Sequence, residues 1–200
     1  MADSAAPTTL PVRKEDGADE TAPEGARVLV AGIGNIFLAD DAFGPEVIKA
    51  LRGVPFPPGV DVHDFGIRGL DLAYRLQDGY AAVVLVDASP RGDAPGTLYV
   101  IEPEPQDDAA AAPEAHGMDP VKVLALARHL GDAPLPRVVV LGCEPEISPR
   151  GDEDIIDGLS ASVREAVGRA AALLPALARS LAADPEGDID LSQRAPADPA

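Results

Sequence analysis

The stretch VLVAGIGNIFLADDAFGPEVIKAL, residues 28–51, contains the pattern that decides the fold of this 200-residue chain. An apolar run leads into a Gly-x-Gly turn, two adjacent acids follow, and Pro45 opens an amphipathic segment. This order predicts a buried parallel strand, a glycine turn and a helix. Such a turn is typical of a phosphate site, but Asp40 and Asp41 would repel a phosphate, and the loop carries no base. The charges therefore argue against a bound nucleotide.

Apolar runs with the length of strands recur along the chain. They lie at residues 27–33, 60–65, 81–88, 96–102 and 137–143. The first, third and fifth are apolar throughout, which is typical of central parallel strands. We expect helices at 45–53, 69–79, 119–131 and from about residue 154, and we expect Pro175 to kink or end the last one. The alternation predicts a single α/β domain, a three-layer α/β/α sandwich with a mostly parallel five-stranded sheet. The turn-rich link at 89–97 makes the fourth strand a candidate antiparallel edge.

Both ends of the chain are polar and lack an apolar period. We therefore expect disordered tails at 1–26 and 184–200 around a folded body at 27–183. The two tails and the acidic run 102–115 carry 13 of the 18 net negative charges. This acidity argues against nucleic-acid binding, which needs a basic face. No apolar run approaches the roughly 20 residues of a membrane span, and no signal-peptide core is visible, which predicts a cytoplasmic protein without a membrane segment.

Polar side chains lie at or after the carboxyl ends of several predicted strands. In such folds, ligands bind at this edge of the sheet, which the carboxyl ends of the strands form. Asp64 and Asp87 lie at the ends of the second and third strands, Asp41 lies in the turn after the first strand, and His116 stands just before a predicted helix. Two carboxylates and an imidazole suit a divalent metal, and three protein ligands leave positions open for substrate or water. Each residue also has an ordinary interpretation, as a helix start, a turn residue or a solvated histidine. Asp40 fits a cap or turn residue better than a ligand.

Five segments together resemble the maturation endopeptidases of nickel–iron hydrogenases. They are GIGNIFLADDAFG (32–44), DFGIRGL (64–70), VLVDA (84–88), HGMD (116–119) and LGCEPE (141–146). The resemblance covers about residues 27–180, and its most specific part is Gly-x-Gly-Asn followed, after four residues, by two adjacent acids. It implies an α/β/α fold and removal of a C-terminal peptide from the hydrogenase large-subunit precursor once nickel is in place. It also implies the aspartic-type endopeptidase class.

The resemblance also assigns the site. It matches the family's metal-contacting acid to Asp41, its strand-end aspartate to Asp87 and its histidine to His116. The chain departs from the family pattern at Ala42, where a glycine is frequent, and in the turn at 64–69, which lacks one glycine and a threonine. These departures concern the choice of substrate more than the chemistry, because the three implied ligands are intact.

The resulting hypothesis is a metal-gated endopeptidase. Asp41, Asp87 and His116 would complete the coordination of a nickel ion that the precursor presents, so the resting enzyme need not hold the metal. Asp87 or Asp64 could serve as general base, and nickel could also polarise the scissile carbonyl. Three alternatives remain at this point. They are a non-catalytic nickel-sensing chaperone for the same precursor, a Rossmann-like nucleotide-binding protein, and a thiol hydrolase that uses Cys143, the chain's single cysteine, with His116.

Overall fold

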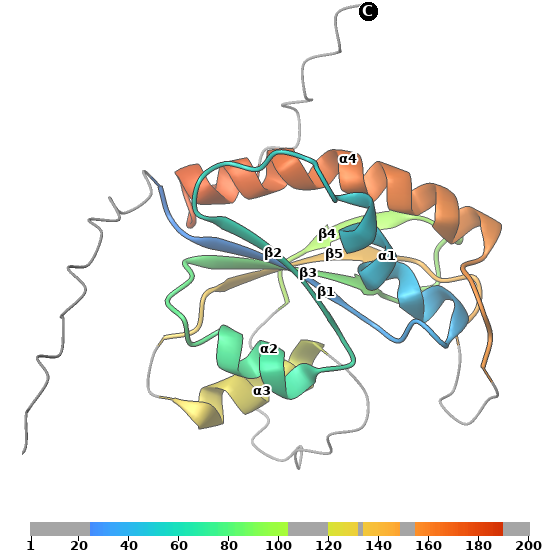
Figure 1. Cartoon of the computed structure of the whole chain (residues 1–200), viewed down its shortest axis with the longest axis horizontal. Coiled ribbons are helices and arrows are strands. Elements are labelled where there is room, and N and C mark those ends of the chain that lie inside the picture. The colour runs from blue at the N-terminus through green and yellow to red at the C-terminus, as the bar shows by residue number, and fades with distance from the viewer. Residues whose placement is uncertain (1–24, 104–119, 132–133, 149–154, 190–200) are drawn as a thin grey trace, which may run out of the picture.

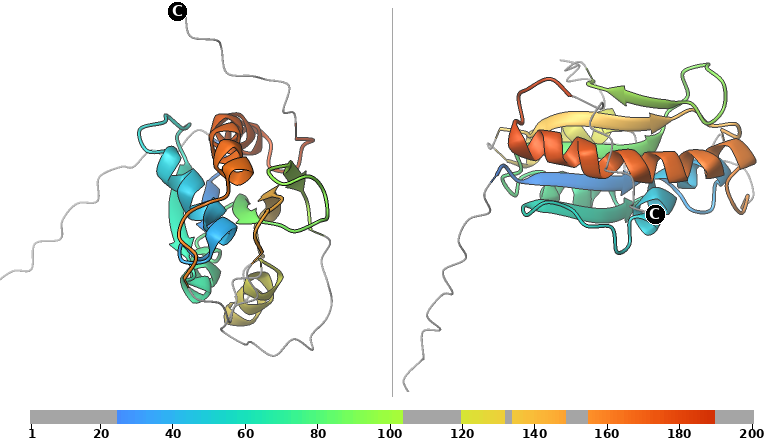
Figure 2. Two further views of the ribbon diagram at one scale, coloured as in Figure 1. Left: turned by 90° about the vertical axis from the view of Figure 1, so that its right-hand side faces the viewer. Right: turned by 90° about the horizontal axis from the view of Figure 1, so that it is seen from above.

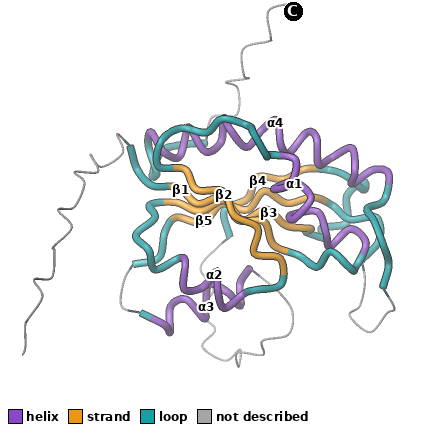
Figure 3. The backbone as a smooth tube through the Cα atoms, in the orientation of Figure 1, coloured by secondary structure: helices purple, strands orange, loops and turns teal. Residues whose placement is uncertain are grey.

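The computed structural model describes residues 25–103, 120–131, 134–148 and 155–189. One sheet contains the strands β1 (Val28–Ile33), β2 (Val60–Gly66), β3 (Ala82–Ala88), β4 (Leu98–Ile101) and β5 (Arg137–Cys143). Around it lie the 3-10 helix η1 (Ala39–Ala42) and the helices α1 (Phe43–Ala50), α2 (Gly69–Arg75), α3 (Pro120–Leu130) and α4 (Ala161–Ala183). Figure 1 and Figure 3 show their arrangement.

The strand order in the sheet is β2-β1-β3-β5-β4. All neighbouring pairs are parallel except β4 and β5, which are antiparallel. The predicted mostly parallel five-stranded sheet with an antiparallel edge is therefore confirmed. The chain passes from β1 outward to β2 and then returns to β3 on the other side of β1. In open α/β sheets, ligands bind at the carboxyl ends of the strands where the order reverses, and here these strands are β1 and β3.

Helices cover both faces of the sheet. The pair α1 and α4 lies on one face and the pair α2 and α3 on the other, as two views of the ribbon show (Figure 1, Figure 2). Successive β1 residues alternate between the two cores, because side chains along a strand point to opposite faces. Val28 and Val30 pack with Phe43 of α1, whereas Leu29 packs with Leu72 of α2. The three-layer architecture is confirmed.

Helix α4 is the longest element and forms much of one core. It begins at Ala161, later than expected, and continues through Pro175 to Ala183. The prediction that Pro175 could end the helix is wrong, because Leu174 and Leu177 are fully buried against the sheet and this packing offsets one lost backbone hydrogen bond. By length and composition α4 could span a membrane, contrary to the expectation from the sequence. Its apolar stripe packs against the sheet, as in a core helix.

The described chain continues past residue 183 and remains in contact with the fold. The Arg137 guanidinium donates hydrogen bonds to the carbonyl oxygens of Pro185, at 2.8 Å, and Gly187, at 2.6 Å. Ile189 packs against the core that contains α4. The C-terminal segment 184–189 is thus attached to β5. Residues 1–24 and 190–200, most of the predicted tails, lie outside the described residues.

Candidate functional site

The glycine turn after β1 is closed by the protein's own oxygen atoms. The Gly34 N–H donates to the Gly66 carbonyl oxygen at 3.1 Å, and the Asn35 N–H donates to Asp41 Oδ2 at 2.6 Å. Gly34 has a φ of 129°, and a Cβ there would lie 1.9 Å from the Asp41 carbonyl oxygen, so the position requires glycine. In a phosphate site these N–H groups would point at the ligand. Here they bind a backbone carbonyl and a carboxylate, which speaks against the nucleotide-binding alternative.

Asp41 is half-buried in η1 and has one oxygen available. Within the described part of the chain, its Oδ1 accepts no hydrogen bond, and Oδ2 accepts the one from Asn35. Burial raises the pKa of the Asp41 carboxyl, and the bond from Asn35 opposes this shift. A half-buried carboxylate with an unused oxygen is stabilised by a nearby cation. Asp41 can therefore supply one ligand oxygen.

Asp40, its neighbour, has a different role. Its side chain is fully buried. Asp40 Oδ2 accepts hydrogen bonds from the N–H groups of Glu146, at 2.9 Å, and Ile147, at 2.8 Å, while Oδ1 accepts one from Ser160 at 2.7 Å. Ser160 immediately precedes α4. Asp40 therefore has a structural role, but the expected cap or turn role is wrong, because its side chain fixes the distant β5–α4 connection and does not cap its own helix.

A left-handed residue separates the turn from the two acids. Ala39 has a φ of 48°, which is uncommon for a residue other than glycine. Its N–H donates to the Ile156 carbonyl oxygen at 2.8 Å, and the Ile156 N–H donates to the Phe37 carbonyl oxygen at 3.0 Å. These two bonds form a short parallel bridge between the β1–η1 turn and the segment before α4. The bridge holds the backbone conformation from which Asp40 and Asp41 extend.

The other predicted carboxylates lie near the ends of β2 and β3, the two strands that flank β1. Asp87 closes β3 opposite Gly142 of β5 and is 7% exposed. Asp64 lies near the end of β2, is exposed, and accepts the Gly66 N–H on Oδ1 at 2.9 Å. Because the strand order is β2-β1-β3, Asp64 and Asp87 flank the strand whose connection carries Asp41. The three carboxylates therefore share one edge of the sheet.

The start of α1 presses against this edge. A Cβ on Gly44 would lie 2.2 Å from the Ile33 carbonyl oxygen and 2.3 Å from that of Val86. Only a glycine lets the helix approach the ends of β1 and β3 so closely. The contact sets the distance between η1, which carries Asp41, and the end of β3, which carries Asp87.

His116 lies outside the described residues. Among the residues that the structure does describe, no group of three or more His, Cys, Asp or Glu side chains could hold a metal ion. The metal set of Asp41, Asp87 and His116 therefore depends on a residue whose position is not described, and it stays a prediction.

Glu144 is a buried acid that the sequence analysis passed over. It follows β5, is 5% exposed, and accepts hydrogen bonds from the Tyr99 hydroxyl at 2.7 Å and from the N–H groups of Arg91 at 2.7 Å and Gly92 at 3.1 Å. The Tyr99 bond is the main cause that lowers the pKa of Glu144. Its signal, an acid directly after a buried strand, is the same one that identified Asp87. Glu144 fixes the β3–β4 connection.

Cys143 does not have the properties of a nucleophile. It is 1% exposed, and burial raises the pKa of its thiol to about 12. The thiolate is the reactive form of cysteine, and it is scarce at neutral pH under these conditions. The thiol hydrolase alternative therefore has no support in the structure.

Comparisons with known proteins agree with this fold. A family model described as hydrogenase maturation protease matches residues 45–176. The hydrogenase expression/formation protein HoxM of Cupriavidus necator is 35% identical over 150 residues, which cover 74% of this chain and 73% of that protein. The hydrogenase expression/formation protein HupM of Azotobacter chroococcum is 34% identical over 158 residues, 78% of this chain and 70% of that protein.

A solved structure supports the same relationship. The hydrogenase maturating endopeptidase HybD from E. coli superimposes with a TM-score of 0.57 at 25% identity, covering 77% of this chain and 93% of that one. The family match runs from the first turn of α1 to the last third of α4, and therefore includes β2, β3 and β5. Because the family model, the two relatives and the solved structure each match most of the chain, the chain belongs to the hydrogenase maturation protease family.

Proposed function

We propose that this protein is an endopeptidase that removes the C-terminal peptide of a nickel–iron hydrogenase large-subunit precursor after nickel insertion. Membership of the family supports proteolysis in hydrogenase maturation. The observation that carries the finer proposal is the half-buried Asp41 carboxylate, which occupies the turn where related folds bind phosphate and keeps Oδ1 unused within the described residues. The site is thus suited to a cation brought by the substrate.

Nickel in this proposal is part of the substrate. Substrate thiolates would hold it, and Asp41, Asp87 and His116 would complete its coordination with ligands that nickel accepts. Asp41 and Asp87 are supported as a pair by their place on one edge of the sheet, on either side of the close contact at Gly44. A precursor without nickel would lack this anchor. The metal would then act as a checkpoint before cleavage.

Hydrolysis also needs a proton acceptor for the attacking water and a donor for the leaving amine. Asp64 is a candidate for both steps because it is exposed and its Oδ1 is oriented by the Gly66 N–H. The bond between Gly34 and Gly66 connects the Asp64 turn to the Asp41 turn. The Asp64 carboxylate would take a proton from the attacking water and then pass it to the nitrogen of the leaving amine. Asp87 is the second candidate, and either would fit the aspartic-type class.

The test is the mass of a purified large-subunit precursor after incubation with the protein, with and without nickel loaded. We expect a loss of mass only with nickel, and no loss with Asp41→Asn, Asp87→Asn or His116→Ala. Asp188→Asn, at an exposed acid in the C-terminal segment 184–189, is the matched control and should cleave normally. Tight nickel-dependent association without any loss of mass would instead identify a chaperone. Cleavage that persists in the Asp41 variant would refute the proposed site.

A further inference from the structure

Exposed apolar side chains gather at the same edge as the carboxylates. Among the described residues, the large apolar side chains with high exposure are Ile36, Phe37, Ile67, Leu70, Tyr74, Ile147 and Ile155. All of them except Tyr74 lie in the connections that follow β1, β2 and β5, or in the first turn of the next helix. Single exposed apolar residues are normal, but a group at one edge is typical of a binding surface.

The turn at Ile36 and Phe37 is the most informative part of this group. Turns commonly carry polar residues, yet these two side chains are 51% and 54% exposed. The turn is also well ordered. The Phe37 N–H donates to Asn35 Oδ1 at 3.0 Å, the Leu38 N–H to the Asn35 carbonyl oxygen at 3.1 Å, and the Phe37 carbonyl oxygen accepts the Ile156 N–H. A partner would find the backbone that carries both side chains already in place, which reduces the entropy lost on binding.

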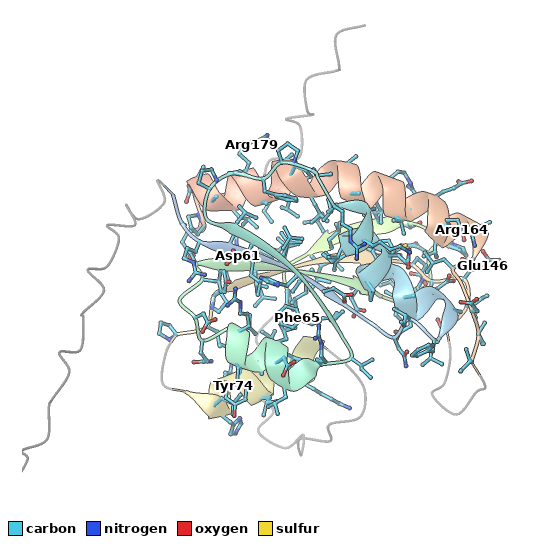
Figure 4. All side chains as sticks on the ribbon, in the orientation of Figure 1. Asp61, Phe65, Tyr74, Glu146, Arg164 and Arg179 are labelled. Carbon is cyan, nitrogen blue, oxygen red and sulfur yellow. The ribbon has the colours of Figure 1, made fainter. Side chains whose placement is uncertain are left out.

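A depression of about 280 Å³ adjoins this turn. Its lining combines apolar and charged side chains: Ile36, Ala42, Glu46, Asp157, Gly158, Leu159, Arg164 and Val167. Arg164 and Glu146 both lie at the end of the molecule where β1 ends, and this end faces the viewer in the left view of Figure 2 (Figure 2, Figure 4). A lining that combines apolar side chains with charges of both signs is compatible with a protein–protein interface.

We propose that Ile36, Phe37 and Ile155, here named the apolar ridge, dock the folded surface of the precursor beside its scissile bond. This inference rests on the proposed function. Phe37 lies four residues before Asp41 in an ordered turn, and Ile155 adjoins the residue that pairs with Phe37. A partner that brings its nickel to Asp41 therefore comes close to the turn that carries the ridge. The depression beside Ile36 would receive an apolar side chain of that partner, as an anchor residue does at other interfaces.

The test compares the double variant Ile36→Ser/Phe37→Ser with Tyr74→Ser, a similarly exposed apolar residue on α2. Cleavage of nickel-loaded precursor gives KM and kcat, and biolayer interferometry gives the affinity. We expect the double variant to raise KM about tenfold or more, with kcat within about twofold of wild type, and Tyr74→Ser to change neither. The urea midpoint should not fall, because the replaced side chains are exposed. The photo-crosslinking analogue p-benzoylphenylalanine should form a covalent crosslink to the precursor on illumination when it replaces Phe37. It should form none when it replaces Tyr74.

The outcomes separate the ridge from the proposed proteolysis. If the double variant has an unchanged KM and no crosslink forms at position 37, the docking role of the apolar ridge is refuted. Cleavage by the wild-type protein in the same experiment would still support the proposed proteolysis. If the wild-type protein binds the precursor without cleaving it, and the double variant does not bind, the docking role of the ridge is supported. The proposed proteolysis is then refuted. A dimer of this chain that the double variant abolishes would assign the ridge to a second copy and overturn the proposal.

Discussion

Asp40 and Asp41 are chemically identical neighbours whose carboxylates have different partners. Asp40 is buried and accepts three backbone hydrogen bonds from the β5–α4 connection, whereas Asp41 is half-buried and accepts one. A substitution of Asp40 should therefore lower stability, whereas a substitution of Asp41 should lower activity. A single round of conservative substitutions tests this separation.

For Asp41→Asn we expect loss of cleavage with unchanged or increased stability. The amide oxygen still accepts the Asn35 N–H, and the cost of a half-buried negative charge disappears. Because folding raises the pKa of Asp41, the ionised carboxylate disfavours the folded state at pH values above that pKa. The gain should thus be largest near pH 7 and shrink as the pH falls through the pKa of Asp41. Urea unfolding at pH 7.5 and pH 4, beside the precursor mass assay, measures both effects.

For Asp40→Asn we expect a large loss of stability. An amide has only one acceptor oxygen. Its NH2 group would face N–H groups whose hydrogen bonds the carboxylate accepted, so those bonds are lost. Hydrogen bonds to charged groups contribute about 1.5–3 kcal/mol each, and water can reach the exposed Glu146 and Ile147, so we expect a total loss of about 3 kcal/mol in urea unfolding. Asp157→Asn should change it by no more than about 0.5 kcal/mol. Equal midpoints for the two variants would contradict this account.

For Cys143→Ala we expect cleavage within about twofold of the wild-type rate. The thiol is buried and its pKa is raised to about 12, so iodoacetamide should label it only after unfolding. Mass spectrometry of native and urea-treated protein measures the labelling. Rapid labelling of the native protein together with an inactive alanine variant would revive a cysteine mechanism.

At the scale of elements, the approach of α1 to the sheet depends on Gly44. In Gly44→Ala, the new Cβ would meet the carbonyl oxygens of Ile33 and Val86, which are backbone atoms and cannot rotate away. The helix must shift, and such overpacking costs about 1–3 kcal/mol. We also expect slower cleavage, because η1 would move with the helix. Urea unfolding and the precursor assay measure these changes.

Gly168→Ala is the matched control for that variant. Gly168 lies in α4 with no atom within 4 Å of an added Cβ. Alanine there should stabilise the protein by about 0.5–1 kcal/mol, since it has the better helix propensity. A Gly44 variant as stable and active as wild type would show that the edge tolerates a wider spacing than the structure has.

The strands could be predicted from the sequence far better than the helix ends. Continuous apolar runs mark strands buried on both faces, and all five were located. The ends of α1 and α4 depend on tertiary packing, which explains why α4 runs through Pro175. Asp41 could be identified from its place in the turn after a strand, and Asp87 from its place at the end of one. The roles of Asp40 and Glu144 could not, because their hydrogen-bond donors lie about 50 to 120 residues away in sequence.

At the scale of the whole molecule, the C-terminal segment 184–189 contributes to stability through Arg137. Truncation after Ala183 removes two carbonyl acceptors of its guanidinium and the packing of Ile189. We expect a loss of about 2 kcal/mol in urea unfolding. Truncation after Ile189 should cost no more than about 0.5 kcal/mol. Identical midpoints for both truncations would show that the attachment adds nothing.

The hydrogen bonds of Asp40 join parts of the chain that are synthesised at different times. Its donors follow it by 106, 107 and 120 residues. The bridge between Leu38 and Ile156 spans a similar interval. While the chain emerges from the ribosome, the turn that carries both aspartates therefore lacks the groups that hold it. A partly translated copy has no competent cleavage edge, and proteolysis can begin only when the residues before the last helix have been made.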